Sequence, residues 1–124
     1  MQKSHRIRKN EEFAAVFRSG SSAANRQFVV YWKRKPGQPH FRLGVSASKK
    51  LGNAVVRNRM RRLVKEIVRL HGGRIAPECD LVVIVRKDAT QMEFDELERS
   101  LKHVLKKAGV WLPAAASAAP PDHR

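Results

Sequence analysis

The 124-residue sequence has few of the features that mark membrane-spanning, secreted or disulfide-bonded proteins. No stretch approaches the ~18 apolar residues of a spanning helix, and no apolar segment follows the first residues as in a signal peptide. The single cysteine, Cys79, cannot form an internal disulfide and fits a reducing compartment. We therefore expect a cytoplasmic protein of one domain, without a membrane partner.

Side chains that bind metal ions or transfer protons are also scarce. The five histidines and Cys79 have no ligand spacing, and the first 62 residues contain only two acids, Glu11 and Glu12. Both acids lie at the start of a predicted helix, where they favour the helix dipole. A protein nuclease needs clustered carboxylates or paired histidines. We therefore expect neither catalytic residues nor a metal site in this polypeptide.

Positive charge is abundant and concentrated in one half of the chain. The 26 Lys and Arg against 11 Asp and Glu give a net charge of +15, and 16 of these 26 lie in the first 62 residues. A polyanionic partner would relieve the resulting self-repulsion. A merely solubilising surface would intersperse the two signs, and the basic segments lack the Trp/Phe/Leu face of an interfacial membrane helix. Nucleic acid is the favoured partner.

Apolar residues at helical spacing predict three helices. The expected bounds are 10–20, 53–70 and 90–109. Asn10 and Asn53 are the expected caps of the first two helices, and Thr90 with Glu93 forms a capping box for the third.

Three segments rich in β-branched and other apolar residues predict strands. Segments 28–32 and 41–46 are expected to pair antiparallel across a turn at 34–39, and the apolar run 80–86 to be buried on both faces. Segment 21–26 is predicted to be a polar linker.

The element order α-β-β-α-β-α predicts an α+β sandwich, with helices packed on a small mixed sheet. Residues 1–110 form the expected single domain. The Ala/Pro-rich segment 111–124 has almost nothing to bury, so we expect it to be a disordered tail.

The second predicted helix is basic along one side. Between Lys49 and Arg69 the only acid is Glu66. Neighbouring cations at i and i+4 repel by a few tenths of a kcal/mol per pair, which an anionic partner would relieve; a solvated helix face is the alternative. The planar fork of arginine suits phosphate. The basic side is formed by Arg57, Arg61, Arg62, Lys65 and Arg69, with Arg59 at its border.

Segment 44–63, GVSASKKLGNAVVRNRMRRL, closely resembles the signature of the bacterial ribonuclease P protein subunit. The core of the signature is Arg57-Asn58-Arg59, preceded by Lys-Lys-x-Gly-Asn-Ala-Val. Segments 8–17, 25–28 and 81–86 are also similar to that family. The resemblance covers roughly residues 4–108, and only the Ala/Pro tail falls outside it.

The resemblance implies the protein subunit of a ribonucleoprotein endonuclease that removes the 5′ leader of precursor tRNA. In that family the RNA subunit is the catalyst and holds most of the required Mg²⁺, while the protein binds the leader and broadens substrate specificity. The implied partners are the catalytic RNA and precursor tRNA, with no protein partner evident. The family also implies a left-handed βαβ crossover, against the usual right-handed rule.

Two candidate binding surfaces follow from the residues and the resemblance together. The first is a basic surface for the catalytic RNA, whose binding should depend strongly on salt. Its expected residues are Lys49, Lys50, Asn53, Arg57, Asn58, Arg59, Arg61, Arg62 and Lys65.

The second is a leader-binding cleft of aromatic platforms, each worth ~1–3 kcal/mol per stacked base. Its expected residues are Phe13, Phe17, Phe28, Tyr31, Ser46 and Ser48. A core role is the alternative for Phe13 and Phe17, and it is the more favoured one for Phe28. Two other functions remain open: a non-catalytic ribosomal or RNA-chaperone-like protein, and a DNA-binding module, which the lack of a helix-turn-helix pattern disfavours.

Overall fold

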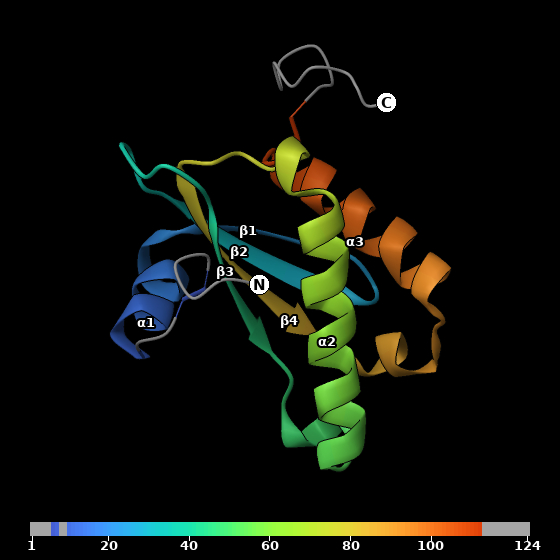
Figure 1. Cartoon of the computed structure of the whole chain (residues 1–124). Helices are drawn as coiled ribbons and strands as arrows, with labels where there is room; N and C mark the ends of the chain where they lie inside the picture. The colour runs from blue at the N-terminus through green and yellow to red at the C-terminus, as the bar shows by residue number, and fades with distance from the viewer. Residues whose placement is uncertain (1–5, 8–9, 113–124) are drawn as a thin grey trace.

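The structure, a computed structural model, describes residues 6–7 and 10–112. Three strands follow the first helix, and the fourth strand lies between the second and third helices (Figure 1). The elements are α1 (Asn10–Ser19), β1 (Ser21–Ala24), β2 (Phe28–Arg34), β3 (Arg42–Ser46), η2 (Lys49–Leu51), α2 (Ala54–Leu70), η3 (Gly72–Arg74), β4 (Cys79–Val85), η4 (Lys87–Gln91) and α3 (Phe94–Ala108), where η marks a short 3₁₀ helix.

The strands form one mixed sheet in the order β1-β2-β4-β3. β1 pairs with β2 and β2 with β4 in antiparallel fashion, whereas β3 and β4 are parallel. The α+β class with a mixed sheet is therefore confirmed. Because α2 joins the parallel neighbours β3 and β4, the βαβ crossover exists, and its left hand stays a prediction.

Two predictions about the strands are wrong. Segment 21–26 contains β1, whose Ser-Ser-Ala-Ala sequence carries no β-branched or aromatic signal. Segment 41–46 does not pair with 28–32, because β4 lies between them. β4 is apolar on both faces, so the central position buries more apolar surface than an edge would.

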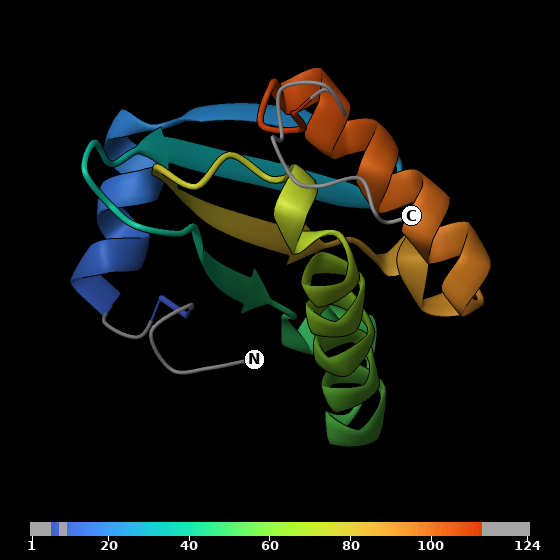
Figure 2. The same cartoon turned by 45° about the horizontal axis from the view of Figure 1, so that its top comes forward.

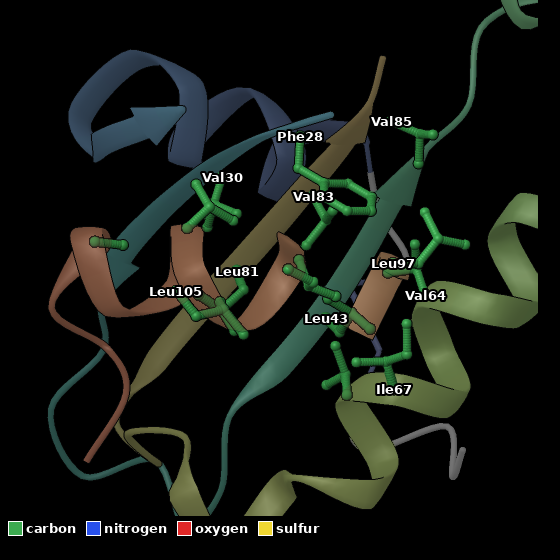
Figure 3. Close-up of a cluster of buried hydrophobic side chains, with 14 of the residues drawn as sticks. Phe28, Val30, Leu43, Val64, Ile67, Leu81, Val83, Val85, Leu97 and Leu105 are labelled. Atoms are coloured by element: carbon green, nitrogen blue, oxygen red, sulfur yellow. The ribbon is translucent and has the colours of Figure 1, made fainter. Parts of the chain in front are cut away.

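Helices cover the two faces of the sheet unequally. α2 and α3 lie on one face and α1 alone on the other (Figure 2). The main core fills the space under α2 and α3 (Figure 3), where Phe28, Leu81 and Leu105 are buried. The core on the α1 face is small, with Val16 on Val82 at its centre.

Side-chain caps set the starts of α2 and α3. The Asn53 side chain accepts a hydrogen bond from the Val56 N–H (3.1 Å), as predicted. The capping box of α3 is Glu93 with Glu96, not Thr90 with Glu93. Thr90 lies in η4 and donates its hydroxyl to the Lys87 carbonyl instead (2.7 Å).

The first two residues of the predicted tail, Trp111 and Leu112, contact the domain, while the boundary itself stays a prediction. Trp111 forms a bridge with Ile75, and the Leu112 N–H donates to the Arg74 carbonyl (2.6 Å). These contacts tie the chain to η3 after α3 ends at Ala108 with Gly109 as its C-cap. The rest of the predicted tail, 113–124, lies outside the described residues.

Candidate nucleic-acid interface

The α1 face of the sheet is only partly covered by its helix. The strand register places side chains of this face in rows across β2, β4 and β3. One row, Tyr31-Val82-Gly44, lies beneath α1, where Val82 packs on the helix. The next row, Val29-Ile84-Ser46, is half-buried. The sheet beside α1 is therefore only partly covered, and this half-buried strip next to the helix is called the groove below.

Two aromatic side chains of α1 face this groove. Phe13 and Phe17 are one helical turn apart, so they share a side of α1. The Phe17 ring is 42% exposed and meets the Tyr31 ring edge-on, with ring centroids 4.9 Å apart. Phe13 is half-buried over Gly44, where a Cβ would lie 2.6 Å from the ring. Phe13, Phe17 and Tyr31 thus line one surface.

Phe28 does not belong to that surface. Its side chain is fully buried in the core under α2 and α3, on the opposite face of the sheet. Phe28 and Tyr31 are three positions apart in one strand, so their side chains point to opposite faces. The prediction that Phe28 binds the leader is therefore wrong, and the strand alternation could have excluded it.

The basic side of α2 leans toward the end of β3. Arg57 Nε and Arg61 Nη2 both donate to the Ala47 carbonyl, at 2.9 and 3.4 Å. Arg61 Nη1 also donates to Asn58 Oδ1 (3.0 Å). Lys49 and Lys50 of η2 are exposed close by, since η2 and α2 are in contact. These cations form one side of α2 and of the short helix η2 that precedes it.

Other predicted residues are placed differently. Arg59 points to the far side of α2, where Nη2 donates to the Met92 carbonyl (3.4 Å), in keeping with its predicted border position. Arg62 is exposed. Asn53 and Ser48 use their side-chain oxygens to cap α2 and η2. Ser46 lies in the groove row beside Ile84.

The aromatic and basic surfaces meet in a hollow of about 350 Å³. Phe13 lines one side of this hollow, and Arg61 and Lys65 of α2 line another. Residues 6–7 form a further side of it, where the Ile7 N–H donates to the Leu43 carbonyl at the edge of β3 (2.9 Å). Arg6 also lines the hollow, and its buried Nε has no hydrogen-bond partner in the described part of the chain.

Arg86 is a further exposed cation that the sequence reasoning did not assign to a surface. It follows β4 two positions after Ile84, so continued strand alternation would place it on the α1 face. Its N–H donates to the Gln27 carbonyl (2.9 Å), and Nη1 to the Asn25 carbonyl (3.3 Å). The alternation of side chains along β4 was the sequence pattern that could have indicated the position of Arg86.

Within residues 6–7 and 10–112 no group of three or more His, Cys, Asp and Glu side chains could hold a metal ion. None of the helices in these ranges is long and apolar enough to span a bilayer.

Comparison with known proteins decides the family. The family model for ribonuclease P matches residues 1–109. The chain belongs to the ribonuclease P protein family. A ribonuclease P protein component of an Exiguobacterium species is 59% identical over 111 residues, which cover 90% of this chain and 96% of that protein. That of Bacillus cereus is 52% identical over 110 residues, covering 89% and 96%.

Solved ribonuclease P proteins share the fold. The Staphylococcus aureus protein is 46% identical, with a TM-score of 0.82 over 88% of this chain and 99% of that one. The Thermotoga maritima protein is 34% identical, with a TM-score of 0.76 over 82% and 96%. The family resemblance is thus confirmed. As a protein component of ribonuclease P, the chain has an RNA partner and is part of the holoenzyme that cleaves tRNA precursors.

Proposed function

We propose that this chain binds the catalytic RNA through the basic side of α2 and the 5′ leader of precursor tRNA through the groove beside α1. The observation that carries the proposal is the hollow in which Phe13 of α1 meets Arg61 and Lys65 of α2. One helical turn from Phe13, the exposed Phe17 ring contacts the half-buried Tyr31 ring. Aromatic platforms beside a positive groove suit unpaired RNA of any sequence. The RNA subunit then supplies the catalytic groups.

The α2 surface suits a folded RNA because its positive charge is hardly compensated. Glu66 is the one acid of α2, and it pairs with Arg69 (2.6 Å) near the C-terminal end of the helix. No ion pair among the described residues involves Arg57, Arg61 or Lys65. Fixed cations of this kind displace the counterions of RNA, so binding is expected to weaken with salt. The remaining residues assigned to the catalytic RNA are Lys49, Lys50, Asn53, Asn58 and Arg62 on or near this surface, and Arg59, which points to the far side of α2.

The groove suits a single strand because it offers both stacking and charge. Bases of the leader would stack near Phe17 and Tyr31, and phosphates would meet Arg61 and Lys65 on one side and Arg86 farther along. Phe13, Ser46 and Ser48 complete the assigned groove. Stacking needs no particular base, which matches a substrate class with varied leaders.

We assign the Mg²⁺ ions of the reaction mainly to the RNA subunit. Mg²⁺ is bound through carboxylate and phosphate oxygens, whereas the surfaces described above consist of cations, aromatic rings and single amides or hydroxyls. These residues do not fit a magnesium site. A cytoplasmic location is inferred from the same substrate and from the free cysteine Cys79.

The test is reconstitution with a bacterial ribonuclease P RNA. Phe17→Ala removes one stacking platform and should weaken binding of leader-bearing precursor about tenfold, within the ~1–3 kcal/mol of one stacked base, without changing affinity for mature tRNA. Leu70→Ala is the matched control, since Leu70 is also half-exposed but lies at the far end of α2. Equal losses on both RNAs would contradict leader binding.

The same assay tests the basic side. Arg57→Ala with Arg61→Ala should weaken assembly with the catalytic RNA and lower the slope of log K against log salt by about 1.5. Arg99→Ala with Lys106→Ala on α3 removes equal charge and should leave the slope nearly unchanged. If the purified protein restored no cleavage at low Mg²⁺, a non-catalytic RNA-binding role would be favoured instead.

A further inference from the structure

Polar contacts tie both ends of α1 to the sheet. Near its start, Arg42 Nη1 of β3 donates to Glu12 Oε2 (2.9 Å). At its end, Lys33 Nζ of β2 donates to Ser19 Oγ (2.7 Å). Because β3 and β2 lie on opposite sides of β4, the helix crosses the sheet between two fixed points.

The Arg42 end is held by a buried carboxylate. Asp80 is 1% exposed and is the one buried charged residue in the described part of the chain. Arg42 binds it with both arms of its fork, Nε to Oδ1 at 2.9 Å and Nη2 to Oδ2 at 2.7 Å. Lys35 adds a longer contact of 3.9 Å. A buried carboxylate is costly without its partner, so Arg42 has one stable position, and its remaining Nη1 points to Glu12.

Glu12 directly precedes Phe13, whose ring packs tightly against the sheet at Gly44. A Cβ on Gly44 would lie 2.6 Å from the ring, so the ring rests on bare backbone. Phe17, one turn later on α1, meets Tyr31 edge-on. A small rotation or lift of α1 would therefore change both aromatic contacts together. Misplacement of binding groups by about 1 Å is enough to cost large factors in rate or affinity.

We propose that Arg42, locked by Asp80, is a positioning residue that holds α1 through Glu12 at the height and rotation at which Phe13 and Phe17 accept the leader. This inference rests on the leader-binding role proposed above. The Glu12–Arg42–Asp80 cluster would not touch the bases of the RNA. It would act on binding by keeping the two aromatic rings of α1 in place.

Charge alone makes the opposite prediction for Glu12. A carboxylate near the groove repels RNA phosphates, so its removal should tighten binding if Glu12 acted only through its charge. If Glu12 holds α1 in place, its removal should weaken binding. The sign of the change therefore separates the two roles.

The experiment measures affinity of the reconstituted holoenzyme for precursor with a leader and for mature tRNA. Glu12→Gln should weaken precursor binding about tenfold, equivalent to about 1.4 kcal/mol, raise KM with kcat unchanged, and leave mature tRNA binding as it was. Glu11→Gln is the matched control: it removes the same charge from the exposed neighbour and should leave binding unchanged or tighter. Tighter or unchanged precursor binding by Glu12→Gln would overturn the proposal.

A second measurement distinguishes the loss of α1 positioning from a general loss of structure. In a Phe17→Ala background, Glu12→Gln should have less effect, because one of the two side chains that it positions is gone; full additivity would overturn the proposal. Arg42→Lys keeps the charge but loses the fork and should reproduce the loss of precursor binding. If Phe17→Ala itself spares leader binding, the proposed function fails; if Phe17→Ala acts and Glu12→Gln does not, only the positioning role fails.

Discussion

The two faces of the sheet differ in how completely they are covered. Two helices of 17 and 15 residues, α2 and α3, close one face over a continuous core. The 10-residue α1 covers part of the other, with a core of Ile7, Val16 and Val82. The closed face supplies the burial that folds a small domain, and the open face keeps aromatic rings within reach of a ligand. Under the proposed function, stability and binding are thereby separated across one sheet.

Charge follows the same division. The cations of α2 that lean toward β3, Arg57 and Arg61, stand beside the open face. Of the two acids in the basic half, Glu12 accepts a hydrogen bond from Arg42 of the sheet, whereas Glu11 is exposed. Under the proposed function, a polyanion meets cations together with aromatic rings on the open side, and this combination suits single-stranded RNA.

The largest expected effect is on stability and compares one aromatic residue from each face. Phe28→Ala should lower the free energy of unfolding by about 3–5 kcal/mol, because it empties a fully buried site. Phe17→Ala should cost less than about 1 kcal/mol, because the ring is 42% exposed. Urea unfolding followed by circular dichroism measures both. Similar losses in the free energy of unfolding for the two variants would contradict the difference in burial between the two faces.

A smaller effect is expected from Gly44, the bare patch of β3 beneath Phe13. Gly44→Ala places a methyl group 2.6 Å from the ring, and such overpacking should cost about 1–3 kcal/mol of stability and weaken leader binding. Gly73→Ala is the control, because a Cβ there meets nothing within 4 Å. Adding Phe13→Ala should recover much of the stability lost by Gly44→Ala, whereas a further loss would show that the ring is not the obstacle.

Local patterns predicted the helices well, because their causes are local. The apolar stripe of α3, including Leu97, Leu101 and Leu105, is buried as its 3.6-residue spacing requires. Asn53 caps α2, and Arg59 lies apart from Arg57, as the helical angle predicts. The basic side of α2 could therefore be listed from the sequence.

Strand pairing and the aromatic groove could be predicted only in part. The choice of β4 over β3 as the partner of β2 depends on contacts between distant segments, and β1 has no pattern of its own. The Glu12–Arg42–Asp80 cluster joins residues 30 and 38 positions apart, so nothing in the local sequence marks Arg42 as different from the many other cations. Such a cluster becomes visible only when the sheet is assembled.

The smallest perturbation is chemical labelling of a thiol on each face. Cys79 faces the closed side and is 3% exposed, and burial, with the nearby Asp80 charge, raises the pKa of its thiol to about 12. The folded protein should therefore react slowly with a thiol reagent at pH 8, because both access and the thiolate are lacking. Unfolding releases this proton between about pH 9 and 12, so the free energy of unfolding should fall as pH rises through that window.

Ser46→Cys in a Cys79→Ala background places a thiol in the open groove. This thiol should label much faster than Cys79, and added precursor should protect it. Fast labelling of native Cys79 would mean that the closed face opens, and would remove the distinction between the two sides.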